Sequence, residues 1–253
     1  MHQPDPTFPP LLSGKPVKGV PGPFGEACAA AARGEAGAGD VFWGRTTSEL
    51  KLAIVLEPEV EAARALQMVF ALMVAFGDAF GAIGPPEVGV FYRWPLGFMV
   101  NAAEIGGARA ALPVGAAPGD VPDRLVVGLD VKMRRDHHDE EPGYDLARTT
   151  LEDEGCGDIT RTELIESLCR HFLVWVHTWN DEGFKPVHDA WMARAEGREE
   201  EVTLKFDGAE HRGHFLGIDE EGNMLLKAGD GGETSALPLI SAVERFDEAG
   251  VKE

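Results

Sequence analysis

Cysteine is scarce in this 253-residue sequence, which contains only Cys28, Cys156 and Cys169. Their number is odd, and no two of them have the C-x-x-C spacing of a zinc or redox motif. A disulfide framework and a cysteine-ligated zinc site are therefore excluded. The low thiol content fits a reducing compartment, and we expect the protein to be cytoplasmic.

Positive charge is scarce as well. The sequence has 23 lysines and arginines against 43 aspartates and glutamates, which gives a formal net charge of −20. Such a surface repels the phosphates of nucleic acids and anionic lipid headgroups. We therefore expect neither nucleic acid nor a membrane among the partners of this protein.

Long apolar runs are missing too. The longest, residues 62–76, is interrupted by Arg64 and Gln67 and is shorter than the roughly 20 residues that a bilayer span needs. The first ten residues hold four prolines and Asp5, without the basic start and apolar centre of a secretory signal. Both observations agree with the expected cytoplasmic location.

What the sequence does contain is enough apolar residues, 44 %, to fill a core. Strand candidates at residues 88–94, 98–103, 107–114 and 124–133 include three joined by short turns, which favours antiparallel pairing. An apolar helix is expected over residues 59–80, and a second helix begins at Thr160, where Thr160 and Glu163 have the spacing of a capping box. These elements predict an α+β fold, a mixed and mostly antiparallel sheet with helices on one face.

The composition and patterning of the sequence divide the chain into three parts. Residues 1–24 are rich in proline and glycine and are expected to form an extended arm. Residues 25–197 hold the sheet and its helices. Residues 198–253 consist of short alternating runs separated by glycine turns, which is typical of a small all-β barrel.

The segment from Arg93 to Ala108 is predicted to be a hairpin followed by a third strand. Pro95 and Gly97 favour a sharp reversal of the chain. Gly106 and Gly107 allow their own backbone to come close to another group. The sequence leaves open whether that group is a neighbouring strand or a ligand.

Three motifs resemble those of biotin protein ligases and lipoate protein ligases. Arg93-Trp94-Pro95 is similar to the start of that family's K-W-P-N-D segment, Ile105-Gly106-Gly107 to its glycine pair, and Gly128-Leu129-Asp130-Val131 to its G-x-G-x-N strand. The resemblance covers about residues 25–245. It implies a mixed sheet backed by helices, often followed by an SH3-like barrel. It also implies ATP-dependent activation of biotin or lipoate and transfer of the acyl group to a lysine of a carrier protein.

The sequence departs from this pattern at charged positions. Leu96 and Gly97 stand where the family has asparagine and aspartate, and Glu104 stands where it has a lysine. The arginine-rich loop expected before Leu50 is reduced to Trp43-Gly44-Arg45. Replacing an ammonium by a carboxylate at an anion site inverts an interaction of a few kcal/mol at an effective dielectric constant of about 20. The sequence therefore predicts that acyl-adenylate formation has been lost.

No residue is assigned a catalytic role with certainty. Lys132 and Lys51 are the candidates to replace the missing lysine, and Cys156 or Cys169 would be the nucleophile of a less favoured transferase. The resemblance implies a set of substrate-binding residues: Trp43, Arg45, Arg93, Trp94, Gly106, Gly107, Gly128 and Asp130.

No metal site is predicted. His137 and His138 lie beside carboxylates, but the side chains of adjacent residues diverge, and a solvated loop explains them better.

The function expected from the sequence is that of a ligase-like pseudoenzyme that retains a pocket for a small carboxylic acid or acyl group. The alternatives are an active biotin, lipoate or octanoate ligase or transferase with a non-standard site, and a regulatory protein that binds other proteins. No cofactor is certain, and ATP with biotin or lipoate is implied by the resemblance alone. The expected partners are a small carboxylic acid or an acyl-carrier-type protein, with the chain as a monomer or homodimer.

Overall fold

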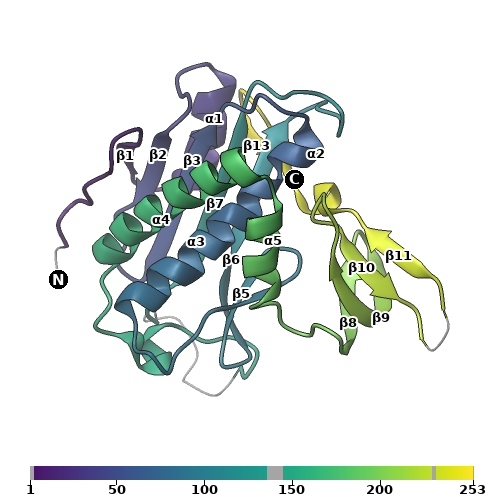
Figure 1. Cartoon of the computed structure of the whole chain (residues 1–253). Helices are drawn as coiled ribbons and strands as arrows, with labels where there is room; N and C mark the ends of the chain where they lie inside the picture. Colours follow the sequence, from purple (N-terminus) through teal and green to yellow (C-terminus); the bar gives the residue numbers. More distant parts are fainter. Residues whose placement is uncertain (1–2, 136–144, 230–231, 253) are drawn as a thin grey trace.

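The computed structural model describes residues 3–135, 145–229 and 232–252. A large twisted sheet with helices on both faces forms the main body, and a smaller sheet lies beside it (Figure 1). Within the described residues, the main sheet runs in the order β1 (Ser13–Val17), β2 (Asp40–Gly44), β3 (Glu49–Leu56), β7 (Leu125–Lys132), β6 (Ala103–Pro113), β12 (Glu244–Asp247) and β13 (Gly250–Lys252).

The main sheet is mixed and mostly antiparallel, as expected. β1 pairs with β2 and β12 with β6 in parallel, and the other pairs are antiparallel. The predicted hairpin is β4 (Phe91–Arg93) and β5 (Gly97–Val100), and β5 pairs with the first half of β6. Because β12 pairs with the other end of β6, β5 and β12 share one edge of that strand.

The expectation that all helices lie on one face of the sheet was wrong. α3 (Gln67–Ile83), α4 (Arg161–Glu182) and α5 (Lys185–Met192) cover one face, preceded by the short α2 (Ala62–Ala65). α1 (Gly22–Ala32) packs on the opposite face, against Ala53, Val55, Ala111 and Val126. Its buried side chains are mostly alanines, so it has no stripe of large apolar residues to reveal which face it covers.

The apolar segment Ala62–Ile83 is long and apolar enough to cross a membrane. Its most apolar stretch of 18 residues has a mean hydropathy of 1.8, and 78 % of that stretch is buried inside the protein. α3 lies against α4 and against strands β6 and β7, which accounts for apolar side chains all round it. The segment is therefore the core helix of the main body.

The predicted capping box begins α4. The Thr160 hydroxyl accepts from the backbone N–H of Glu163 at 3.2 Å, and the Glu163 carboxylate accepts from the backbone N–H of Thr160 at 3.1 Å. Farther along the helix, the Trp175 and Trp179 indoles donate to Asp78 and Gln67 of α3 at 2.8 and 2.6 Å. These bonds fix α4 on α3.

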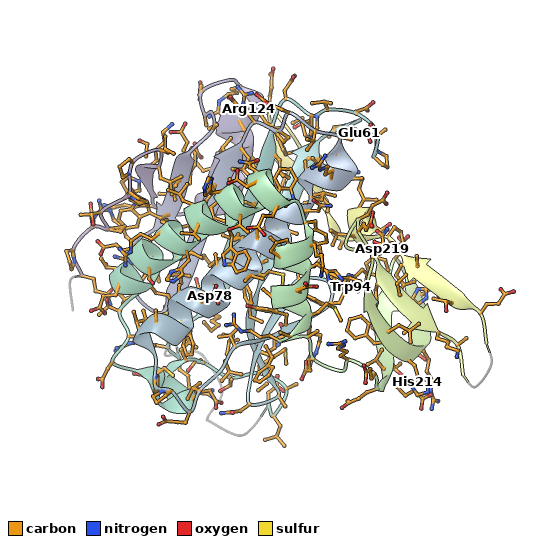
Figure 2. All side chains as sticks on the ribbon, viewed as in Figure 1. Glu61, Asp78, Trp94, Arg124, His214 and Asp219 are labelled. Atoms are coloured by element: carbon orange, nitrogen blue, oxygen red, sulfur yellow. The ribbon has the colours of Figure 1, made fainter. Side chains whose placement is uncertain are left out.

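The C-terminal sheet contains β8 (Glu201–Phe206), β9 (Ala209–Ile218), β10 (Met224–Lys227) and β11 (Thr234–Leu237) in antiparallel order. A separate all-β unit was expected here and is present, and its SH3-like form stays a prediction. Trp94 lies at the junction with the main body (Figure 2). Its indole donates to the Gly222 carbonyl at 3.0 Å and packs against Phe206.

Two domain limits differ from those expected. The last strands, β12 and β13, lie in the main sheet instead of the expected 198–253 barrel, because β12 extends the edge of β6. The N-terminal arm, expected to be extended over residues 1–24, contributes β1 to the sheet and the first turn of α1.

The structure also contains two short helical segments, η1 (Glu152–Cys156) and η2 (Leu239–Ala242). The loop around His137 and His138 lies outside the described residues.

Replacing Thr160 by alanine removes the cap of α4. We expect the free energy of unfolding to fall by about 1 kcal/mol, because the Glu163 amide loses its acceptor. Urea denaturation followed by circular dichroism measures this loss. Thr178→Ala, in the interior of the same helix, is the matched control and should leave stability nearly unchanged; equal losses in the two variants would contradict the capping role.

Candidate functional site

Arg93 and Trp94, two of the predicted substrate-binding residues, lie at the junction with the C-terminal sheet. Arg93 pairs with Glu196 at 2.8 Å, and Trp94 is 5 % exposed and bonded to the Gly222 carbonyl. Both residues line a cavity beside β8, and none of the other predicted site residues lines it. Their contacts hold the two sheets together.

The glycine pair serves the packing of strands. A Cβ on Gly106 would lie 2.0 Å from the Asp130 carbonyl oxygen, and the φ angle of Gly106, +141°, is one that other residues rarely adopt. A Cβ on Gly107 would lie 2.8 Å from the Leu96 carbonyl oxygen. The backbone of a neighbouring segment thus approaches both glycines closely.

Gly128 faces a side chain of the protein itself. A Cβ there would lie 2.6 Å from the Leu52 carbonyl oxygen and 2.7 Å from the Phe24 ring. Phe24, on α1, is 5 % exposed, and the Arg109 guanidinium carbon lies 4.0 Å from its ring centroid. Glu244 of β12 accepts two hydrogen bonds from Arg109, each 2.8 Å. The sheet face over Gly128 is thus filled by a stack of side chains.

A cavity of about 330 Å³ opens beside this stack, where β2 and β3 meet the turn before α1. Three of its lining residues are basic, Lys18, Arg45 and Lys51, and one is acidic, Glu49. The complete lining comprises residues 17–23, 44–46, 49 and 51. The cavity is therefore small and has a positively charged wall.

Alternating charges cross the sheet beside the cavity. β3 and β7 pair so that Glu49 faces Lys132 and Lys51 faces Asp130. The Lys51 ammonium lies 2.5 Å from Glu49 and 3.4 Å from Asp130, and Lys132 lies 2.7 Å from Glu49. The four formal charges cancel, which leaves Lys51 partly exposed but already paired.

Burial and ion pairing act against each other on these groups. Burial raises the pKa of Asp130 above its usual value, although Lys51 opposes the shift. Burial alone would also raise the pKa of Glu49, but hydrogen bonds from Lys132 and Lys51 outweigh it and the pKa is lowered. For Lys51, burial is outweighed by Glu49 and Asp130, and the pKa is raised. Lys51 is therefore charged at neutral pH.

Arg45 lines the cavity, but its neighbour Trp43 does not. Trp43 is 2 % exposed in the core beneath α4, and the guanidinium carbons of Arg45 and Arg161 each lie 5.1 Å from its ring centroid. Arg45 also binds Asp5 of the N-terminal arm with two hydrogen bonds of 2.5 Å. Trp43 positions the cation and does not reach the cavity.

The remaining candidates do not line this cavity. Glu104, at the position of the family's lysine, is partly buried, and its backbone N–H donates to the Ala147 carbonyl at 2.8 Å. Cys169 is fully buried, which raises the pKa of its thiol to about 12. Burial also raises the pKa of Cys156. Both thiols are protonated at neutral pH and are poor nucleophiles.

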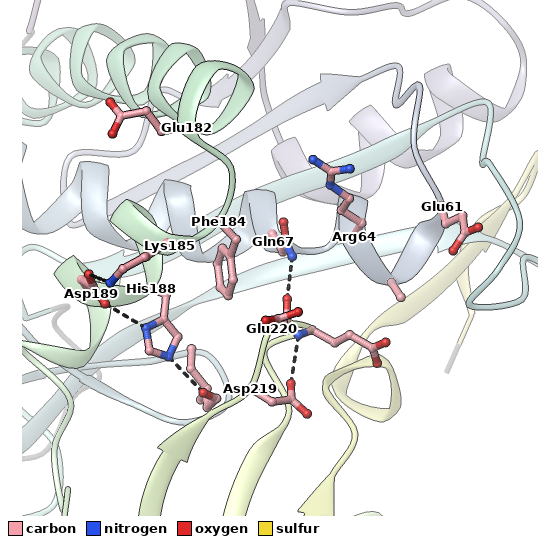
Figure 3. A pocket seen from close by; sticks show the side chains of 13 residues that line it. Glu61, Arg64, Gln67, Glu182, Phe184, Lys185, His188, Asp189, Asp219 and Glu220 are labelled. Atoms are coloured by element: carbon pink, nitrogen blue, oxygen red, sulfur yellow. Dashed lines mark hydrogen bonds and ion pairs between the residues drawn. The ribbon is translucent and has the colours of Figure 1, made fainter.

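A larger cavity of about 770 Å³ lies between α2, α5 and the turn between β9 and β10 (Figure 3). Six carboxylates line it, namely Glu61, Glu182, Asp189, Asp219, Glu220 and Glu221. Of its basic groups, Lys185 pairs with Asp189 at 2.6 Å, the His188 Nε2 lies 2.9 Å from the Ile218 carbonyl oxygen, and the Arg64 guanidinium lies over the Trp179 ring. Such a lining repels an anionic ligand, so the smaller cavity is the candidate site for a carboxylic acid.

The structure brings together four of the residues that the sequence singled out, Arg45, Lys51, Asp130 and Lys132. Sequence reasoning missed Glu49, Phe24 and Asp5. Glu49 could have been found, because Glu49 and Lys51 on one strand mirror Asp130 and Lys132 on the next. No group of three or more metal-binding side chains occurs within residues 3–135, 145–229 and 232–252.

The fold and the motifs define a class of protein. The model of the biotin/lipoate A/B protein ligase family matches residues 8–193, and the chain belongs to this family. The mixed sheet backed by helices is also the architecture of biotin protein ligase from Aquifex aeolicus, with a TM-score of 0.65 at 18 % identity over 83 % of this chain and 90 % of that one. The expected fold class is thereby confirmed.

Two relatives are similar to this chain over most of its length. The biotin–[acetyl-CoA-carboxylase] ligase of Paracoccus denitrificans is 27 % identical over 193 residues, 76 % of this chain and 78 % of the relative. A biotin protein ligase-like protein of unknown function from Silicibacter sp. TM1040 is 35 % identical, with a TM-score of 0.83 over 94 % of this chain and 98 % of that one.

Replacing Gly128 by alanine tests whether Phe24 fills the sheet face. The new methyl group would meet both the Phe24 ring and the Leu52 carbonyl, so we expect a loss of about 1–3 kcal/mol in the free energy of unfolding. Gly119→Ala is the control, because a Cβ there meets nothing within 4 Å. Urea denaturation measures both variants, and equal stabilities would show that the face over Gly128 is open.

Proposed function

We propose that this protein binds a small carboxylic acid in the 330 Å³ cavity and does not convert it to an acyl-adenylate. The observation that carries the proposal is the arrangement around Lys51: a charged ammonium at a cavity wall, beside a sheet face filled by Phe24. The proposal rests on the family membership of the chain and on the chemistry of the residues that line this cavity.

The size and charge of the cavity favour one small acid. Its volume lies at the lower end of the roughly 300–1,000 Å³ found for small-molecule sites. Lys18, Arg45 and Lys51 give its wall a positive charge in a chain whose net charge is −20. The turn at residues 17–23 supplies valine and proline side chains for an apolar tail. A carboxylate with a short acyl chain matches both features.

The residues present do not fit ATP. A triphosphate needs several cations that are free to neutralise it. Of the three cations that line the cavity, Arg45 is bound by Asp5 and Lys51 by Glu49 and Asp130, which leaves Lys18. Phe24 and two backbone carbonyls occupy the space next to Gly128, Gly107 and Gly106, where a nucleotide would need room. We therefore assign no adenylation step to this chain.

The relatives support an acyl ligand without deciding the chemistry. A structure of the Aquifex aeolicus biotin protein ligase contains biotin and ATP, but that protein is 17 % identical and supports the fold alone. The name of the Paracoccus relative favours the main alternative, an active acyl ligase that modifies a carrier protein. The experiments below separate the two functions.

Removing the ammonium of Lys51 should weaken binding of the acid. In the unaltered protein we expect octanoate at 100 times its Kd to raise Tm by about 5–10 °C. Lys51→Met should weaken octanoate binding at least about tenfold, since a hydrogen bond to a charged group is worth about 1.5–3 kcal/mol. Isothermal titration calorimetry measures the Kd.

Lys15→Met is the matched control for this experiment. Lys15 has the same exposure as Lys51, 39 % against 37 %, and likewise pairs with a carboxylate, but it does not line the cavity. Its variant should bind octanoate with unchanged affinity. The proposed function fails if neither octanoate, lipoate nor biotin binds the unaltered protein.

Adenylation itself is tested by pyrophosphate exchange. Purified protein incubated with Mg²⁺, ATP and labelled pyrophosphate should form no labelled ATP in the presence of biotin, lipoate or octanoate. The Aquifex or Paracoccus ligase serves as the positive control. Exchange above background with any of the three acids would favour the active ligase instead.

A further inference from the structure

Arg45 lines the cavity and forms an ion pair with Asp5 of the N-terminal arm. Its two terminal nitrogens donate to the two carboxylate oxygens of Asp5. This fork geometry is the one by which arginines bind the carboxylates of ligands. An arginine that lines the cavity is therefore already bound by a carboxylate of the protein itself, Asp5, which is not one of the lining residues.

A second arginine lies behind the first. Arg161 is 2 % exposed, donates to the Gly44 carbonyl at 3.2 Å, and has no hydrogen-bond partner for its Nε. Arg161 and Arg45 contact the same indole, that of Trp43. Two guanidinium groups thus share one nearby carboxylate, Asp5. A buried cation without a counterion is costly, so this corner of the protein favours an anion strongly.

The segment that carries Asp5 is attached by only a few polar contacts. The backbone N–H and hydroxyl of Thr7 donate to Glu166 at 2.8 Å, and the Thr162 hydroxyl donates to the Pro4 carbonyl at 2.7 Å. Asp5 itself is about half exposed, with 49 % of its side chain accessible. Ion pairs that water can reach contribute little to stability. A soluble carboxylate could therefore compete with Asp5.

We propose that Arg45, with Arg161 behind it, is the carboxylate-binding site of the cavity, and that Asp5 of the N-terminal arm occupies it as an internal competitor. The ligand class is a small carboxylic acid, and for this ligand the inference rests on the function proposed above. Binding displaces the Asp5 carboxylate from Arg45 and replaces one guanidinium–carboxylate pair by another. Ligand affinity is then set partly by the arm.

Asp5→Asn should tighten the binding of octanoate about fivefold, because the neutral amide competes less well for Arg45. Asp207→Asn, in an exposed turn of the C-terminal sheet, changes the net charge equally and should leave the Kd unchanged. In a protein that also carries Arg45→Gln, Asp5→Asn should have no effect. Calorimetry gives the Kd of all five proteins, namely the unaltered protein, the three single variants and the double variant, and an unchanged affinity in Asp5→Asn overturns the proposal.

A second measurement needs no ligand. Phenylglyoxal modifies accessible arginines, and mass spectrometry of the digested protein reports the rate at Arg45. We expect Arg45 to react several times faster in Asp5→Asn than in the unaltered protein or in Asp207→Asn. Equal rates overturn the competitor role even if octanoate binds. A faster rate in a protein that binds no octanoate supports the Asp5 contact and overturns the proposed function alone.

Discussion

The contact between the Phe24 ring and Gly128 determines how much of the sheet a ligand can reach. Gly128 has no side chain, so the ring lies directly on the backbone of the central strand β7. Arg109 covers the ring from the other side and is itself held by Glu244 of β12. Strand β12 thereby helps to close one part of the sheet face, and the cavity next to this part is small.

Electrostatics reinforces this limit. The alternating Glu49, Lys51, Asp130 and Lys132 side chains neutralise one another across two strands, and Asp5 neutralises Arg45. A small monoanion can exchange with one of these carboxylates at little cost, whereas a triphosphate would have to displace several. Family membership and the proposed loss of adenylation are thus compatible: the strands and helices are kept, while Arg45 and Lys51 at the cavity are already paired with carboxylates.

Sequence patterns predicted strands β4 to β7 of the main sheet, the capped helix α4 and the family, because apolar periodicity, Thr160–Glu163 and the glycine motifs are local signals. They did not reveal the face that α1 covers, since its alanines carry little directional information. Nor could they predict the partner of Gly128: a glycine next to a ligand and one next to a ring look alike in sequence. The long-range contacts of Asp5 and Glu244 leave no local signal at all.

A crystal structure of the protein with octanoate tests the central claim most directly. The account predicts the carboxylate within hydrogen-bonding distance of Lys51 or Arg45, the acyl chain in the turn at residues 17–23, and Phe24 still in contact with Gly128. An acyl chain lying over Gly128, with Phe24 displaced from the sheet, would contradict it. The sheet face would then be open to a ligand.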